Sequence, residues 1–306
     1  MAGRPKLGKR ILLEKERYIL ILPAIVWYAI FAYIPIFGLT LAFRRYDANL
    51  GMFASPWVGL KNFDRVFIDP AFFTSILTTL RINAGRLIFV FPFPILLALM
   101  INEVRLGRTK KILQSIYTFP NFLSWVIVAS VMINVLGRKG LVNGFLINVF
   151  GTQPIAFLGK PDYFRPVIFI TDIWKTAGWS AIIYMASISG IDVEQYEAAE
   201  IDGASRLQRM WYITLPGIKT TIMVLFILAV GNLMSGGFDQ IFNLSNSATL
   251  KVAETLDMYI YRITFKGSVD FGFSSAVALF RSVINMLLLI AADRVSKAVG
   301  GSGLLG

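Results

Sequence analysis

Six long apolar stretches divide the chain, and polar residues, many of them basic, separate them. Each stretch approaches or exceeds the roughly 20 residues that a helix needs to cross a bilayer. None shows the alternation of polar and apolar residues that a membrane strand requires, so helices that satisfy their own backbone are expected. The sequence therefore predicts an all-α integral membrane protein with six transmembrane helices, at residues 18–43, 73–101, 113–136, 165–189, 218–238 and 274–292.

Composition supports a membrane protein and excludes several kinds of chemistry. Of the 306 residues, 56% are hydrophobic and 16% are charged, against about 25% charged in soluble domains. The chain has no Cys and no His, which excludes disulfides, thiol nucleophiles, Cys/His metal sites and Ser-His-Asp triads. The net charge of +12 could indicate nucleic acid, but the basic residues flank apolar stretches, where they orient membrane proteins. No nucleic-acid partner is expected.

Basic residues also predict the orientation, because Lys and Arg concentrate on the cytoplasmic side of a membrane protein. They are dense before the first stretch and in the short loop after the second, at Arg4, Lys6, Lys9, Arg10, Lys15, Arg17, Arg105, Arg108, Lys110 and Lys111. We expect both termini to be cytoplasmic, although Arg44 and Arg45 directly follow the first stretch on the other side.

The predicted domains follow from these spans. They are a basic cytoplasmic tail (1–17), a first transmembrane helix with its outer loop (18–72), a transmembrane domain (73–292) and a second cytoplasmic tail (293–306). The long outer loop contains Pro and aromatic residues, as at 55–60, and is expected to be ordered.

One cytoplasmic loop, residues 191–216, is acidic in its first half, whereas basic residues are usual on this side. Asp192 suits the N-cap of a first helix, with Gln195 completing a capping box. Gly203 permits a turn, and a second helix from about residue 204 places Leu207, Met210 and Trp211 on one stripe. Pro216 suits the first turn of the fifth span.

The small residues Ala198 and Ala199 beside Glu197 would let a partner approach the first helix closely. An amphipathic helix lying in the membrane interface is the alternative interpretation. The loop contains the series Glu197-Ala198-Ala199, Gly203 and Ile213-x-Leu215-Pro216, with Asp202 before the glycine. This series resembles the EAA loop of binding-protein-dependent ABC importer permeases. Around Pro23 and at residues 31–35, 55–63, 119–126 and 278–285, the chain is similar to the lipoprotein-permease-B group of Gram-positive polysaccharide and sugar permeases.

This resemblance implies half of the channel of a type I ABC importer for oligosaccharides, in a bacterial plasma membrane. Its partners would be a second permease subunit, two ATPase subunits and an extracellular solute-binding lipoprotein. The residues implied in coupling to the ATPase are Glu197, Ala198, Ala199, Asp202, Gly203, Ile213, Leu215 and Pro216. The chain contains no Gly-x-x-x-x-Gly-Lys-Ser/Thr loop, so ATP and Mg are expected on the ATPase subunits, with no cofactor and no enzymatic activity here.

Polar residues at membrane depth are candidates for the substrate path. Aromatic rings and hydrogen-bonding groups suit sugars, and the candidates are Asn232, Phe238, Asp239, Trp174, Lys175, Arg281 and Asn285. Seven residues separate Asn232 from Asp239, so a helix would place both on one face. Arg281 and Asn285 would likewise share a face.

Alternatives exist for the charged residues in the spans. Asp172 and Lys175 could form a local ion pair, and Arg81 and Arg86 could extend to the outer interface. A cavity-facing Arg281 or Lys175 would favour acidic oligosaccharides unless an aspartate neutralised it.

The sequence argues against three other functions. A secondary transporter or channel would need carboxylates near the bilayer centre, and only Asp172 lies well inside a span. A membrane enzyme would need a cluster of reactive groups that the spans lack. An amino-acid or phosphate permease could carry the same loop, but the long first outer loop argues against it.

Overall fold

The computed structural model describes residues 14–104, 107–266, 270–298 and 303. Over these residues the chain is helical between its connections, with an isolated β-bridge joining Arg44 and Trp57. Most of the predicted N-terminal tail and parts of the C-terminal tail, as well as Arg105, fall outside the described residues. The chain forms two compact units, Met1–Ile68 with Ile263–Phe280, and Asp69–Arg262 with Arg281–Gly306, which are described separately.

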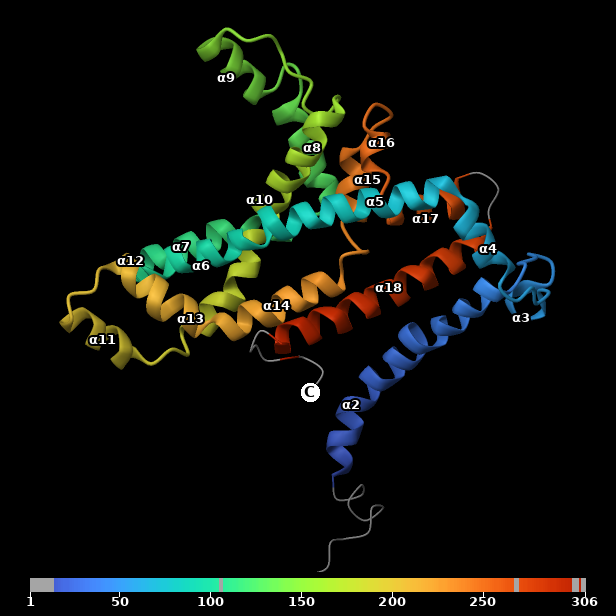
Figure 1. Cartoon of the computed structure of the whole chain (residues 1–306), viewed down its shortest axis with the longest axis horizontal. Helices are drawn as coiled ribbons and strands as arrows, with labels where there is room; N and C mark the ends of the chain where they lie inside the picture. Colours follow the sequence, from blue (N-terminus) through green and yellow to red (C-terminus); the bar gives the residue numbers. More distant parts are fainter. Residues whose placement is uncertain (1–13, 105–106, 267–269, 299–302, 304–306) are drawn as a thin grey trace, which may run out of the picture. The chain divides into compact units, whose positions relative to one another are not determined.

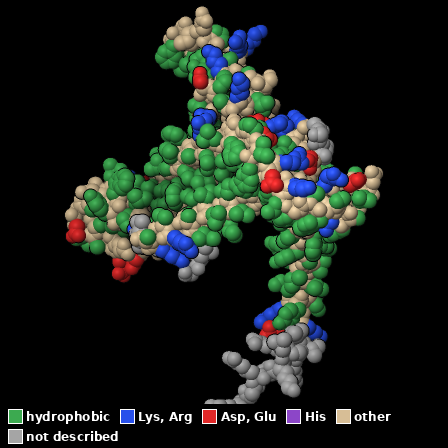
Figure 2. Space-filling view, turned by 45° about the vertical axis from the view of Figure 1, so that its right-hand side comes forward, with side chains coloured by type: hydrophobic (Ala, Val, Ile, Leu, Met, Phe, Trp, Pro, Cys, Tyr) green, Lys and Arg blue, Asp and Glu red, His purple; other side chains and the backbone are tan. Residues whose placement is uncertain are grey.

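The first unit begins with a long apolar helix. It comprises α2 (Lys15–Tyr28), a π-helical turn η1 (Ala29–Tyr33) and a 3-10 segment η2 (Ile34–Phe43), which follow one another without a break (Figure 1). No side chain of α2 is buried, and hydrophobic side chains cover the arm above the grey residues in Figure 2. A helix that is apolar on all sides and exposed in the protein suits contact with lipid. The predicted helix at 18–43 is confirmed.

The loop that follows, predicted to lie on the outer side, is ordered, as expected. It contains two short helices, α3 (Gly51–Ala54) and α4 (Lys61–Ile68). The Arg44 guanidinium donates to the carbonyl oxygens of Phe53, at 2.6 Å, and Ser55, at 2.8 Å. The Asn62 amide donates to the carbonyl oxygens of Ala42 and Arg44, each at 2.9 Å. These bonds satisfy backbone groups at the end of η2 and fix the loop against it.

The second unit contains most of the helices. In chain order they are α5 (Pro70–Gly85), η3 (Arg86–Val90), α6 (Pro92–Asn102), α7 (Gly107–Thr118), η4 (Phe119–Phe122), α8 (Trp125–Leu136), α9 (Leu141–Phe150), α10 (Pro161–Ile188), α11 (Val193–Ile201), α12 (Arg206–Arg209), η5 (Met210–Thr214), α13 (Leu215–Gly217), α14 (Lys219–Gly231), α15 (Phe238–Leu244) and α16 (Leu250–Ala253). Helices α17 (Leu256–Phe265) and α18 (Phe271–Ala298) each contribute residues to both units.

Helix α10 is the centre of the second unit, with α6 and α7 packed along it (Figure 1). Its Gly178 lies so close to α7 that an added Cβ would collide with the carbonyl oxygen of Tyr117. One buried cluster joins α6 and α10 and includes Ala98, Ala181 and Tyr184. A second cluster surrounds the first half of α10 and includes Phe164 and Ile168.

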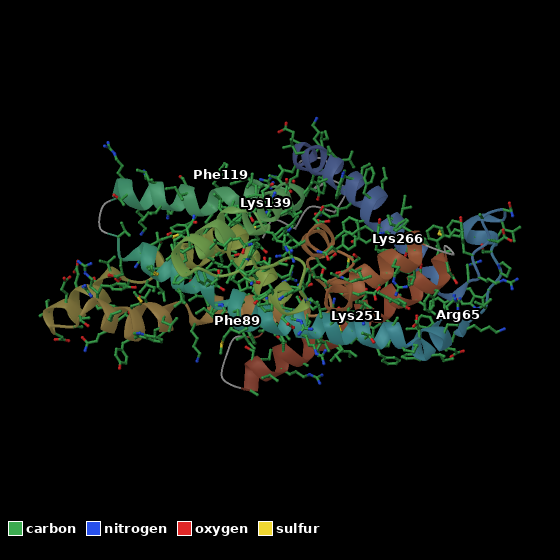
Figure 3. The ribbon with its side chains drawn as sticks, turned by 90° about the horizontal axis from the view of Figure 1, so that it is seen from above. Arg65, Phe89, Phe119, Lys139, Lys251 and Lys266 are labelled. Carbon is green, nitrogen blue, oxygen red and sulfur yellow. The ribbon has the colours of Figure 1, made fainter. Side chains whose placement is uncertain are left out.

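Among the described residues, four helical stretches are long and apolar enough to cross a membrane, or five if a bent pair is one span. They are Lys15–Phe43, Pro70–Asn102, Trp125–Phe150 and Phe271–Ala298, and the pair is Arg206–Gly217 with Lys219–Gly231, bent by 60°. Exposed apolar side chains outside the cores, such as Phe89 and Phe119 (Figure 3), are consistent with a lipid-covered surface. Helix α10 has 28 residues and matches the predicted fourth span, but it carries charged residues and is not among these stretches.

Two predicted spans differ from the structure. The predicted span over 113–136 is broken into two helices, because a 3-10 turn containing Pro120 follows α7 and the Ser124 hydroxyl then caps α8, accepting from Ile127 N at 3.3 Å. The predicted helix over 218–238 ends early, at Gly231, and a loop at 232–237 follows.

Candidate functional site

The loop at 191–216 contains a first helix, α11, with a defined beginning and end. Asp192 caps its N-terminus, as predicted, accepting from Glu194 N at 3.0 Å. At the other end, Gly203 has φ +77°, in the left-handed region that glycine adopts without strain. The amide of Gly203 donates to Glu200 O at 3.1 Å and that of Ala204 donates to Ala199 O at 2.9 Å. These two bonds around a left-handed glycine form a Schellman cap, which explains the spacing between Ala199 and Gly203.

A capping box begins the second helix rather than the first, where it was predicted. Ser205 Oγ accepts from Gln208 N at 3.4 Å, and Gln208 Oε1 accepts from Ser205 N at 2.7 Å. The signal was visible in the sequence as Ser-x-x-Gln beginning two residues after Gly203. For α11, the structure gives Asp192 the capping role without a reciprocal bond from the Gln195 side chain.

The loop is also fixed at its base. The hydroxyls of Tyr196 and Thr214 lie 2.9 Å apart, and Glu200 forms a 3.0 Å ion pair with Arg209. Leu215 packs against the buried cluster of α6 and α10. Capped helices with such cross-links form a stiff projection rather than a flexible linker.

The outward surface of this loop combines an acidic group with apolar side chains. Glu197, Ala198, Asp202, Gly203 and Pro216 are exposed, whereas Ala199, Ile213 and Leu215 are half-buried. Large apolar side chains are strongly exposed, at Val193, Ile201, Leu207, Trp211 and Tyr212. Of the predicted stripe, Leu207 and Trp211 face outward and Met210 packs inward. Several large apolar side chains exposed on one short segment are typical of an interaction surface.

A pocket of about 360 Å³ is lined by both helices that flank this loop, α10 and α14. Residues of α5, η3, α6, α10, α14 and the loop after α14 line it, with Phe91 between η3 and α6: Asn83, Arg86, Leu87, Val90, Phe91, Pro94, Asp172, Thr176, Ser180, Ile183, Tyr184, Leu225, Ala229, Asn232, Leu233 and Ser235. Apolar side chains form most of the wall, and the polar ones are mainly hydroxyls and amides. Few polar groups in a mostly apolar concavity are typical of a small-molecule site.

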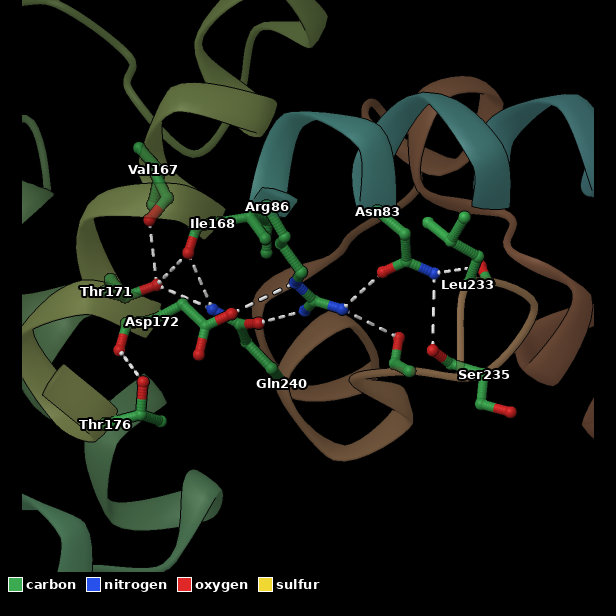
Figure 4. A network of polar contacts seen from close by, with 11 residues as sticks. Asn83, Arg86, Val167, Ile168, Thr171, Asp172, Thr176, Leu233, Ser235 and Gln240 are labelled. Carbon is green, nitrogen blue, oxygen red and sulfur yellow. Dashed lines mark hydrogen bonds and ion pairs between the residues drawn. The ribbon is translucent and has the colours of Figure 1, made fainter. Parts of the chain in front are cut away.

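Arg86 is the most connected side chain of this pocket (Figure 4). Its Nε lies 3.0 Å from Asp172 Oδ2, an ion pair in which both side chains are largely buried. Its Nη1 donates to Asn83 Oδ1, at 3.0 Å, and to Gly236 O, at 3.1 Å, and its Nη2 donates to Gln240 Oε1 at 2.6 Å. The interpretation that Arg86 extends to the membrane interface is therefore wrong, and sequence reasoning missed Asn83 and Gln240.

Comparison with known proteins identifies the family. Residues 90–301 match the family described as "Binding-protein-dependent transport system inner membrane component". The chain belongs to this family. It is 41% identical, over 98% of its length and 94% of the relative's, to the polygalacturonan/rhamnogalacturonan transport system permease protein YteP of Bacillus subtilis. It is 39% identical to the protein LplB of the same organism, over 95% of the chain and 91% of the relative.

A solved structure agrees with this assignment. A chain of a bacterial ABC transporter involved in the import of the acidic polysaccharide alginate has a TM-score of 0.86 and 36% identity, covering 96% of this chain and 99% of that one. A second structure, the alginate transporter in complex with a periplasmic protein that holds an alginate pentasaccharide, has a TM-score of 0.87. The present chain is thus a multi-pass membrane protein and a permease subunit of an ABC importer.

Few of the predicted path residues of this permease reach the pocket. Asn232 lines it. Lys175 is buried elsewhere, donating to Asn121 O at 2.8 Å with its ammonium 5.4 Å from the centre of the Trp125 ring. The local pair of Asp172 with Lys175 is accordingly replaced by the Asp172–Arg86 pair. Trp174 is exposed and does not line the pocket.

The shared face expected for Asn232 and Asp239 is wrong, because the permease chain turns between α14 and α15. Gly236 and Gly237 have φ +147° and +79° in this turn. Asp239 is exposed, and Phe238 stacks on Phe242 with ring centres 5.2 Å apart. The adjacent glycines were the available sequence signal for the break.

Arg281 and Asn285 do share a face of α18, as predicted, and both hold the loop at 232–237. Asn285 Oδ1 accepts from Met234 N at 3.0 Å, and its Nδ2 donates to Ser235 Oγ at 2.7 Å. Arg281 pairs with Asp257, which also accepts from Gly236 N at 3.1 Å. These residues act on the pocket wall through the loop rather than by lining the pocket.

Proposed function

We propose that this permease imports an oligosaccharide and couples its movement to ATPase subunits through the loop at 191–216. One half of the translocation path belongs to this chain, and a second permease subunit supplies the other half. Two ATPase subunits bind ATP and Mg on the cytoplasmic side, and an extracellular solute-binding lipoprotein delivers the substrate. Six transmembrane helices, the five candidate spans together with α10, place both termini in the cytoplasm.

The connectivity of the loop supports the coupling role. It joins α10 directly to the segment that leads into α14, and both of these helices line the pocket. Since the loop is capped and cross-linked, a force applied to α11 reaches both pocket walls rather than being absorbed by a flexible connection. Closure of the ATPase dimer would draw the loop along and reshape the pocket, and hydrolysis would reverse the movement.

The exposed patch of the loop is the single observation that carries this proposal. Ile201 is 87% and Tyr212 is 79% exposed, next to the exposed Glu197 and Ala198. Such apolar exposure on a rigid element is costly in water and is offset when a partner covers it. Ala198 leaves room for close approach, and Glu197 supplies a charge that a complementary cation can recognise.

The pocket supports a sugar as cargo. Thr176, Ser180, Asn232 and Ser235 offer hydroxyl and amide groups that suit hydrogen bonding to sugar hydroxyls. Proteins named for the transport or import of a polysaccharide are similar to this permease over nearly its whole length. This similarity supports a saccharide substrate here.

Glu197→Lys tests the coupling role in the assembled importer. It reverses a charge in the patch and should reduce uptake by at least tenfold while the permease stays in the membrane. Gln195→Lys is the matched control, because residue 195 is also exposed on α11 but lies about 200° around the helix from residue 197. Equal uptake by both variants and the wild type would refute docking through this face.

A further inference from the structure

The pocket wall contains one cation and one anion, Arg86 and Asp172, among otherwise neutral side chains. Each lies on a different element, η3 and α10, and they face each other across the wall (Figure 4). The formal charge of the lining is therefore zero. The groups that a ligand could bind depend on which N–H donors of Arg86 and which oxygen atoms of Asp172 are already bonded to the protein.

Arg86 has little left to offer a ligand. A guanidinium has five N–H donors; the hydrogen bonds to Asn83, Gly236 and Gln240 occupy three of them, and the Asp172 carboxylate lies beside Nε as the ion-pair partner. The backbone of the 232–237 loop closes on the same group, so that a Cβ at position 237 would collide with Arg86. Binding a carboxylate with two parallel N–H groups would require Arg86 to leave partners that hold this loop in place.

Asp172 makes that exchange unfavourable. If Arg86 turned to a ligand carboxylate, Asp172 would remain largely buried without its counter-ion, which is costly. If Arg86 stayed, the ligand carboxylate would lie beside the like charge of Asp172 in a wall whose surface is mostly apolar. A hydroxyl meets neither penalty, because it can donate to the aspartate or exchange hydrogen bonds with Thr176 and Ser180, which line the same pocket.

We propose that this pocket selects an uncharged sugar unit, and that Asp172 determines the selection by retaining Arg86 and repelling carboxylates. This inference rests on the proposed role of the chain in saccharide transport and specifies the unit held between α10 and α14. The proposal concerns only the sugar unit in this pocket. A substrate with acidic units at other positions would still place the hydroxyls of a neutral unit in the pocket. Replacing Asp172 by a neutral residue leaves Arg86 uncompensated and converts the wall into an anion site.

Direct binding to the purified permease–ATPase assembly, without the binding protein, tests this selection. The probes are a galacturonic acid trisaccharide and its fully methyl-esterified form, which differ in charge at the carboxyl groups, titrated by saturation-transfer NMR. The wild type should bind the ester at least tenfold more tightly than the acid. Asp172→Asn should raise the affinity for the acid at least tenfold and reverse the order. Asp239→Asn, which removes an exposed carboxylate outside the lining, should leave the order unchanged.

A second variant keeps the test independent of how well Asp172→Asn folds. Ser180→Lys adds an uncompensated cation to the same lining and should also raise the affinity for the acid. Three results would overturn the proposal: a wild type that binds the acid at least as tightly as the ester, no gain in acid affinity for either variant, or no binding of either probe. Coupling to the ATPase is tested separately by Glu197→Lys and Gln195→Lys, so that a failure of selection is distinguishable from a failure of the proposed function.

Discussion

Gly203 provides a quantitative test of the proposal that the loop at 191–216 couples the permease to the ATPase. It has φ +77°, and nothing lies within 4 Å of the Cβ that a larger residue would add. A substitution therefore introduces no clash, and its cost comes from the left-handed backbone alone. This cost is about 1–2 kcal/mol for an L-residue such as alanine. Asparagine tolerates this region better because its side chain can hydrogen-bond locally.

The expected effect follows from this cost. One to two kcal/mol reduces the population of the turned loop, relative to other conformations, by a factor of roughly 5–30. If the ATPase recognises only the turned loop, Gly203→Ala should lower ATPase stimulation by the loaded binding protein by up to that factor. Gly203→Asn should fall between Gly203→Ala and the wild type, and Gly203→Val should be the most impaired because its side chain is β-branched.

The assay is ATPase activity and uptake in proteoliposomes that contain the complete importer. Gly190→Ala is the matched control: Gly190 is exposed just before the same loop but is not among the glycines with positive φ. If Gly203→Ala matches Gly190→Ala and the wild type in both readouts, the handedness of this turn has no part in coupling.

Three further predictions concern the same architecture. Ser205→Ala removes the capping box of α12 and should cost about 1 kcal/mol, measured as faster hydrogen exchange at residues 205–210; unchanged exchange would contradict the cap. Gly178→Val should lower the melting temperature and the yield of folded permease, because α7 leaves no space for a side chain; a wild-type melting temperature would contradict this packing. Burial and the hydrogen bond to Asp69 raise the pKa of Tyr259, so its contribution to stability is full below pH 10 and declines as the pH rises further; thermal melts of Tyr259→Phe should lack this decline, and identical profiles would refute it.

Local signals in the sequence were sufficient to predict much of the structure of the loop at 191–216. The Asp192 cap and the turn at Gly203 depend on residues within a few positions of one another, and such interactions are readable without tertiary context. The long apolar helices were predictable for a related reason, since the length of a hydrophobic stretch is a property of the sequence itself.

Long-range partners were not predictable in this way. Arg86 hydrogen-bonds Gln240, 154 positions away, and the sequence offered the nearby Lys175 as the simpler partner for Asp172. The same limit explains the error at Asn232 and Asp239. Leu233 and Met234 extend the apolar stretch beyond Gly231, whereas backbone held by Asn83, Asn285 and Asp257 ends the helix.

Cross-linking of the loop tests the central claim most directly. The natural chain has no Cys, so Ala198→Cys introduces a unique thiol at the exposed face of α11, and Asn49→Cys places one on the exposed outer loop. In membranes that contain the whole importer, a short thiol-to-amine cross-linker should join the permease to an ATPase subunit through position 198 and not through position 49. A thiol at position 198 that reacts freely with a water-soluble maleimide, but never cross-links to an ATPase subunit, would contradict the account.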